Sequence, residues 1–496
     1  MTISQKVMDY ASKIELQIKE DLNRRREQGE RFSLTVDEWT GENNKRYANI
    51  NVHMPDRTVH HLGLIRIKGS MTAEVCKEMV VQRTAQFGLD IQMDIICCTT
   101  DAASVMVKFG KLMDCEQQLC YAHGVNLAVC DVLYTNNASS VPLPELEENN
   151  PNNDSSDFDD NEEIDDDGPI LNLSNEVVNN VTLGFLNSVI QKVRGVVKLF
   201  RRSPVKNDLL QKFVKEDLGK EMCLVLDVKT RWNSLIAMLE RFLELIVPLK
   251  KTMTCLDIAI PFSEEDVKKV QEICLALKPL ELVVKTLSGR NCTLVIAETA
   301  VNFALEELHF QGSLLSSQLE SSLKNRMKER RSVLASAANC LCNGGNMDSV
   351  SEISMVKNTL INLAQKLNVT VDQGTSDGSE TFDNGDSWSE ERPNSMADRL
   401  RIALEKSAEK SLRPKISSTR TNPIEMAIRR ELEFFRTMGQ RGKVLEILHK
   451  ALMSVPPTSV DAERAFSASG LFLTKIRSRL GDETLSKLTL LRAYFK

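Results

Sequence analysis

Two aspartates follow strand-like runs, and their placement is the first sign of chemistry in the sequence. Asp37 ends the alternating run "RFSLTVD", and Asp101 ends the apolar run "MDIICCTTD". If these two strands lie side by side, both carboxylates meet at one edge of a sheet. Carboxylates held close together repel one another unless a cation lies between them, and Mg²⁺ prefers such oxygen ligands. The simpler interpretation is a strand that ends in a solvated acidic tip.

A third acid, Glu463, lies in the C-terminal run "PPTSVDAERAFSASG". Thr458 is a candidate N-cap with Asp461 three residues later, so a helix is expected to begin here. Glu463 would then lie in its first two turns, on a face that is otherwise small and apolar. It could be a further metal ligand, or an acid that stabilises the start of a helix.

Cys120 and His123 form a Cys-x-x-His pair on one face of the helix predicted at 119–134. No second pair has ligand spacing, so no structural zinc site is expected in this chain. The plain alternative for the pair is a core thiol beside a hydrogen-bonded histidine.

The elements that must position these residues follow from the hydrophobic periodicity. Strands are expected at 31–37, 45–54, 58–69 and 94–100, with a fifth at 222–228, and helices at 5–29, 72–88 and 119–134. Three antiparallel strands, a crossover helix and further strands indicate an α/β fold with a mixed sheet. Helical patterns dominate the ranges 177–200 and 240–366. Three further helices are expected near the C-terminus.

Composition limits the class of protein. The 496 residues contain no apolar run long enough to cross a membrane. Twelve cysteines without a secretory signal indicate free thiols in a reducing compartment. The tract 135–170 holds twelve acids and no Lys or Arg, so it is expected to be disordered, as is 372–395. The whole chain has a net charge of −6. The chain without that tract is mildly basic, which is compatible with nucleic-acid binding.

Basic clusters occur at Arg24–Arg26, 200–206 and 324–331. They could contact phosphates, although such clusters on helices are more often solvated faces.

Five short motifs together resemble the hAT superfamily of DNA transposases, in particular its BED-type zinc finger-associated and domesticated relatives. The motifs are "TVDEW" (35–39), "TTDAAS" (99–104), "CYAH" (120–123), "TRWNS" (230–234) and "SVDAERAFSASG" (459–470). The last motif, followed by "TKIRSRL", is similar to the C-terminal hAT dimerisation segment. The resemblance runs from about residue 5 to the C-terminus. No Cys-x-x-Cys is present, so no BED finger is expected within this sequence.

The resemblance implies an α/β fold: an RNase H-like mixed sheet interrupted by a large all-α insertion, with a C-terminal helical dimerisation segment. It implies a catalytic, metal-binding triad of Asp37, Asp101 and Glu463 that uses Mg²⁺ or Mn²⁺ for DNA strand cleavage and transfer. The expected division is a leading helix (1–30), a first core part (31–134), the acidic tract (135–170), a second core part (171–237), the helical insertion (238–424) and the dimerisation segment (425–496).

The resemblance also implies roles for two residue pairs. It places Cys120 and His123 near the active centre, where they would support the metal site. Arg231 and Trp232 would bind DNA, with Trp232 stacked on an unpaired base, an interaction worth about 1–3 kcal/mol. A buried tryptophan that anchors the insertion helices is the alternative for Trp232.

Two functions stay open at this point. The first is a hAT-like transposase or transposase-derived enzyme. The second is a domesticated, non-catalytic, dimerising nuclear protein that binds DNA or regulates it. In both, the expected partners are DNA and a second copy of the chain through 425–496, with no membrane and a nuclear location.

Overall fold

The computed structural model describes residues 3–41, 44–133, 180–228, 232–343, 350–369, 422–473 and 480–495. The chain forms two compact units: 1–128 together with 276–496, and 129–275. The tracts predicted to be disordered, 135–170 and 372–395, lie outside the described residues. No helix in the described ranges is long and apolar enough to cross a membrane.

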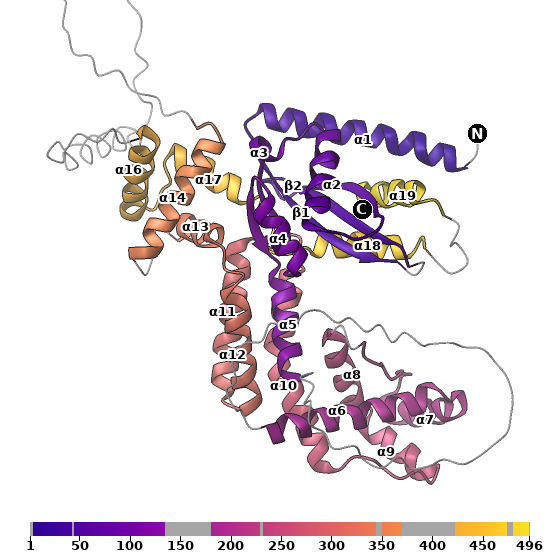
Figure 1. The fold of residues 1–496 in the computed structure, drawn as a ribbon. Helices are drawn as coiled ribbons and strands as arrows, with labels where there is room; N and C mark the ends of the chain where they lie inside the picture. The colour runs from indigo at the N-terminus through magenta and orange to yellow at the C-terminus, as the bar shows by residue number, and fades with distance from the viewer. Residues whose placement is uncertain are drawn as a thin grey trace, which may run out of the picture. The chain divides into compact units, whose positions relative to one another are not determined.

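A five-stranded mixed sheet organises the first unit (Figure 1), in the order β3-β2-β1-β4-β5. The strands are β1 (Phe32–Thr40), β2 (Arg46–His53), β3 (Val59–Ile67), β4 (Ile95–Thr100) and β5 (Glu116–Leu119). The first three strands pair antiparallel, whereas β4 runs parallel to β1 and β5 parallel to β4. The predicted α/β fold with a mixed sheet is therefore confirmed.

Two strand predictions need correction. β1 continues to Thr40 because its last residues pair with β2, so Asp37 lies inside the strand rather than at its end. The fifth strand is 116–119, and the run 222–228 forms no strand apart from an isolated bridge at Val228. Its backbone is held by side chains instead: Gln211 bonds both the N–H and the C=O of Met222.

Opposite faces of the sheet carry different residues. One face is apolar and packs with α1 and α2 into the main core, which includes Leu22, Leu34, Ile50 and Val80. The other face faces α18 and is largely polar. The helices around the sheet are α1 (Ile3–Glu27), α2 (Ala73–Gln86), α3 (Ile91–Asp94), α4 (Ser104–Leu112), α5 (Tyr121–Leu133), α18 (Val460–Gly470) and α19 (Asp482–Tyr494).

α19 packs against β3 and α1 of its own chain. Leu485 and Leu490 are 0% and 1% exposed, and the Tyr494 hydroxyl donates to Gln17 (3.2 Å). β3 and α1 of the same chain thus cover Leu485 and Leu490, whereas Tyr494 stays 42% exposed.

A helical layer completes the first unit and buries its own core, which includes Ile96 and Cys97 of β4. It comprises the end of α10 (Glu264–Leu287), α11 (Leu294–Gln311), α12 (Leu314–Lys328), α13 (Val333–Cys342), α14 (Val350–Lys366), α16 (Pro423–Met438) and α17 (Lys443–Leu452). Four helices rather than three follow residue 422 in the described part, because the 440–442 and 453–459 turns divide the segment before α18.

The second unit contains α6 (Asn180–Arg201), α7 (Pro204–Leu218), α8 (Trp232–Glu244), α9 (Ile246–Cys255) and the start of α10. Arg194 and Asp227 form a buried ion pair within it (Nη2–Oδ2, 2.5 Å). The described part of 171–237, expected to belong with the sheet, lies in this all-helical unit.

Candidate functional site

Asp37 and Asp101 lie on neighbouring parallel strands. Leu34 pairs with Cys98 and Thr35 with Thr99, so two residues further along the register Asp37 comes beside Asp101. Side chains two residues apart point to the same face of a strand. Asp37 therefore shares the α18 face with Thr35. The condition set by the sequence, that these two strands lie side by side, is met.

Glu463 lies in the first turn of α18, which packs on β1 and β2. Trp39 and Phe466 stack across this contact with ring centroids 5.7 Å apart. The expected capping box of Thr458 and Asp461 does not form. Ser459 is the N-cap, its side chain caps no backbone N–H, and it hydrogen-bonds to Asp37 instead.

The pKa of Asp37 responds to both of the other acids. Burial, followed by the charges of Asp101 and Glu463, raises the pKa of Asp37 to about 7. The Glu38 N–H donates to Asp37 Oδ1 (2.8 Å) and opposes this rise, as does Ser459. Carboxylates more than 60 and 420 residues away in sequence thus act on one group. Glu38, the next residue along β1, is ion-paired with Arg46.

The chemistry of this donor set fits a hard divalent cation. Mg²⁺ and Mn²⁺ take carboxylate oxygens, and a cation would relieve the repulsion that raises the Asp37 pKa. In the described ranges, however, no three His, Cys, Asp or Glu side chains are gathered closely enough to hold a metal ion. Asp37, Asp101 and Glu463 would therefore have to move closer together to share one.

The segment that carries Glu463 is fixed to the strands that carry the aspartates. The hydroxyls of Ser33 and Ser454 share a hydrogen bond (2.9 Å). Thr99 Oγ1 donates to the carbonyl of Pro456 (2.7 Å). These bonds join β1 and β4 to the turn before α18, so they set the distance between Glu463 and the sheet.

A buried polar network lies on the same face of the sheet. Thr35 Oγ1 contacts His53 Nε2 (3.1 Å) and accepts from Asn51 Nδ2 (3.0 Å), whose Oδ1 lies 2.7 Å from His61 Nδ1. Burial lowers the pKa of His53 to about 4 and of His61 to about 3, so both rings are neutral at pH 7. The sequence analysis missed this network, although polar residues alternate in "YANINVH".

Cys120 and His123 lie beside the acids. Cys120 is 1% exposed, its N–H donates to the Thr100 carbonyl (2.7 Å), and its Sγ accepts from the N–H groups of His123 and Ser459 (both 3.5 Å). Burial raises the pKa of the Cys120 thiol. Burial also lowers the pKa of His123, and the charge of Asp101 partly offsets this decrease. The pair thus links the strand before Asp101 to the start of α18.

Trp232 lies in the second unit. It is the first residue of α8 and is 1% exposed. Stacking on a base would require this side chain to be uncovered, whereas an anchoring role fits its burial. Arg231 lies outside the described residues.

The first basic cluster is engaged within the chain. Arg25 pairs with Asp21, Glu30 and Asp56, and Arg26 donates to the Gly88 carbonyl (2.6 Å). This cluster therefore stabilises the packing of α1.

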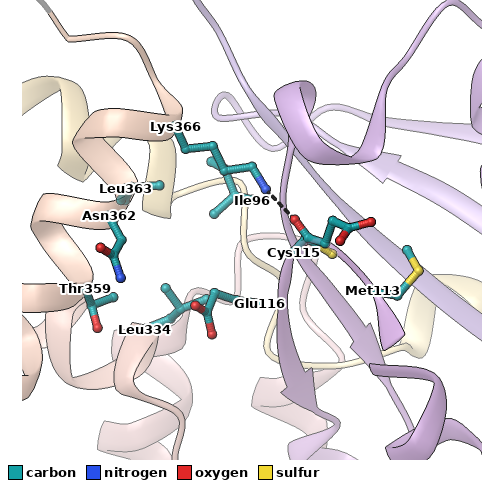
Figure 2. Close-up of a pocket in the computed structure, with 10 residues that line it drawn as sticks. Ile96, Met113, Cys115, Glu116, Leu334, Thr359, Asn362, Leu363 and Lys366 are labelled. Carbon is teal, nitrogen blue, oxygen red and sulfur yellow. Dashed lines mark hydrogen bonds between the residues drawn. The ribbon is translucent and has the colours of Figure 1, made fainter. Parts of the chain in front are cut away.

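A cavity of about 260 Å³ lies beside β5, away from the acids (Figure 2). Figure 2 shows Lys366 reaching across it, and its Nζ donates to the Asp114 carbonyl (3.1 Å). Acidic and basic groups both line the cavity, with Glu116 opposite Lys366. This mixture selects no class of ligand.

Two family models match the chain. The ZBED1 RNase-like helical domain matches residues 171–276, and the hAT family C-terminal dimerisation region matches residues 420–495. No curated protein matches it. The first match coincides with the helices of the second unit, and the second spans α16 to α19.

Proposed function

We propose that the chain is a hAT-family, ZBED-like, transposase-derived protein that cleaves and joins DNA strands in the nucleus with Mg²⁺ or Mn²⁺ held by Asp37, Asp101 and Glu463; the two family matches support the family. One observation carries the proposal: the register of β1 and β4 sets Asp37 beside Asp101, and Asp101 and Glu463 both raise the pKa of this partly buried carboxyl group. Carboxyl groups with perturbed pKa values tend to cluster at functional sites, and a shared cation would relieve the repulsion among these three.

The chain's own residues supply position and charge. β1 and β4 hold the two aspartates side by side, and α18 brings Glu463 over them. Bound divalent metal would stabilise the attacking and leaving oxygens of an in-line displacement at phosphorus. Glu38 is ion-paired with Arg46. Of these two adjacent acids, Asp37 is therefore the one proposed to bind metal together with Asp101 and Glu463.

The dimerisation region supports self-association of the chain. We place this contact in 425–496, with DNA as the second partner. Both DNA binding and the nuclear location are inferred from the family.

A second candidate is the domesticated, non-catalytic DNA-binding or regulatory protein. The burial of Trp232 and the separation of the potential metal ligands in the described ranges favour it. It predicts dimers that bind DNA without any metal-dependent cleavage.

The experiment is a nicking assay on supercoiled DNA with Mn²⁺. Asp37→Asn, Asp101→Asn and Glu463→Gln should each abolish nearly all activity, and a double variant should lose little more, because the acids act as one unit. Asp461→Asn is the matched control, since this acid lies on the same helix and pairs with Arg464. A folded wild type that binds DNA but never nicks it would favour the second candidate.

A further inference from the structure

One buried cation joins the helical layer to the acidic site. Arg330 follows α12 and is 1% exposed, although arginines are almost never fully buried unless they are paired. In the described part of the chain its nearest ion-pair partner is Glu329, at 4.0 Å and on a side chain that is 61% exposed. An ordinary ion pair therefore does not account for its burial.

Arg330 bonds backbone carbonyls instead. Its Nε donates to the carbonyl of Cys120 (3.2 Å), and its Nη1 donates to that of Arg326 (2.7 Å). Its own carbonyl accepts from Gln118 Nε2 (2.9 Å). The guanidinium thus closes the end of α12 and fastens it to the junction between β5 and α5.

α5 leaves space for this side chain. A Cβ on Gly124 would lie 2.5 Å from Arg330 Cδ and 2.6 Å from its Nε, closer than real Cβ contacts come. Gly124 has no positive φ in this structure, so its need for glycine is steric. A side chain at position 124 would thus collide with that of Arg330 where it now lies.

Cys120 is where three segments meet. Its N–H bonds the residue before Asp101, its Sγ accepts from the N-cap of the helix that carries Glu463, and its carbonyl accepts from Arg330. The guanidinium charge also lies within electrostatic reach of Asp101. Fixing Cys120 therefore fixes the carriers of two acids relative to each other.

We propose that Arg330 is a positioning residue of the acidic site: by holding the Cys120 carbonyl it sets the arrangement from which Asp101 and Glu463 close on a shared divalent cation. This inference rests on the proposed function. Arg330 itself need not touch metal or DNA.

The test compares Arg330→Met and Arg330→Lys with the full-length wild type. Lys324→Met is the matched control, because it removes a cation of α12 that is 58% exposed and paired with Glu320. Two quantities are measured at a temperature where all variants are folded: the dissociation constant for Mn²⁺ alone, by calorimetry, and hydrogen exchange of the peptides that contain Cys120 and Ser459.

Arg330→Met should weaken Mn²⁺ binding about 10-fold or more, as removal of supporting residues does at metal sites. Exchange in both peptides should accelerate in the same variant. Arg330→Lys should recover part of each effect, because one ammonium can reach only one of the two carbonyls. Lys324→Met should match the wild type in both measurements.

Unchanged Mn²⁺ affinity in folded Arg330→Met, or unchanged exchange at Cys120 and Ser459, would overturn the proposal. If Arg330→Met fails to fold, Arg330→Lys and Gly124→Ala take its place, since the added Cβ displaces the guanidinium. A wild type that binds no Mn²⁺ would refute the proposed function instead, and the exchange data would then decide whether Arg330 positions Cys120.

Discussion

At the scale of single residues, the proposed metal site depends on the charge of Asp37. A carboxyl group in water titrates near pH 4, but this one has its pKa raised to about 7 by burial, Asp101 and Glu463. Above pH 7 the folded chain must therefore hold a repelled anion. A protein that keeps such a group either uses it or compensates for it elsewhere.

Asp37→Asn should change how stability depends on pH. Between about pH 4 and 7 the folded wild type holds a proton that the unfolded chain releases, so its stability falls as pH rises through this window. The loss is at most about 4 kcal/mol, and less because water reaches the site. With metal chelated, the asparagine variant should be more stable than the wild type at pH 8 and equally stable near pH 4, by hydrogen exchange of β1 and β4.

Asp114→Asn is the control, because this carboxylate is 62% exposed and pairs loosely with Lys77. It should shift stability equally at both pH values. A wild type whose stability does not fall between pH 4 and 7 would show that Asp37 is solvated.

Sequence could predict some of these residues. Asp37 and Asp101 belong to recognisable strand-like runs, so they meet once the two strands lie side by side. Glu463 was indicated by family resemblance, because a helix start explains an acid equally well. Ser459 and Arg330 could not be predicted, since tertiary contacts across more than 200 residues give each its role.

At the scale of elements, the edge strand β3 shows how tertiary contacts finish a sheet. Its register shifts opposite Asn49–Asn51, and Gly63 there has φ +90°. Arg83 Nε donates to the Leu62 carbonyl (2.6 Å), and Ser486 Oγ accepts from the Leu64 N–H (2.9 Å). α2 and α19 thus satisfy backbone groups that an exposed edge would leave open.

Gly63→Ala should destabilise the first unit more than a backbone effect alone. The new Cβ would lie 2.7 Å from both Arg83 Nη2 and Ser486 Oγ, in addition to the strain of a positive φ. The expected cost is about 2–4 kcal/mol, measured as faster hydrogen exchange in β3 and α19.

Gly69→Ala provides the comparison, because it has φ +74° but open space around its Cβ position. Its cost should stay near 1–2 kcal/mol, the conformational penalty alone. Equal effects from the two variants would mean that the contacts of α2 and α19 with the bulge are not tight.

The run 222–228 was predicted to be a strand but forms none apart from an isolated bridge at Val228. Its apolar residues fit a strand, and sequence periodicity cannot show whether a neighbouring strand exists. Side chains of α6, α7 and α8 bond its backbone instead, as Arg241 does at the Cys223 carbonyl (2.8 Å). Asp227 then anchors the run to Arg194.

Arg194→Met should open the second unit. It leaves Asp227, whose side chain is 1% exposed, as a buried charge without its cation, and such losses cost about 3–5 kcal/mol. Hydrogen exchange in α6 and α8 should accelerate accordingly. Adding Asp227→Leu should restore most of the protection, and a double variant as weak as the single one would contradict this account.

At the scale of the whole molecule, the dimerisation region predicts self-association. The helices that form it were predictable from their periodicity, but the partner of α19 was not, because an apolar face does not reveal whether its own chain covers it. Here α1 and β3 cover it. Self-association through 425–496 would then use the surfaces that α1 and β3 leave exposed, such as Tyr494, which is 42% exposed.

Light scattering on the full chain should give at least twice the 55.7 kDa of one copy at micromolar concentration. Deleting α19 is not a valid control, since that helix belongs to the core of its own chain. A mass of one copy over the whole accessible concentration range would contradict self-association.

Thermal melting with and without Mn²⁺, on wild type and Asp37→Asn, tests the central claim most directly. If the three acids share a cation, Mn²⁺ at about 100 times its dissociation constant should add about 2.7 kcal/mol to the wild type and raise its midpoint. Asp37→Asn should melt higher than wild type in chelator and respond little to Mn²⁺. A wild-type midpoint indifferent to Mn²⁺, beside a variant with no gain in chelator, would mean that Asp37, Asp101 and Glu463 do not form a site.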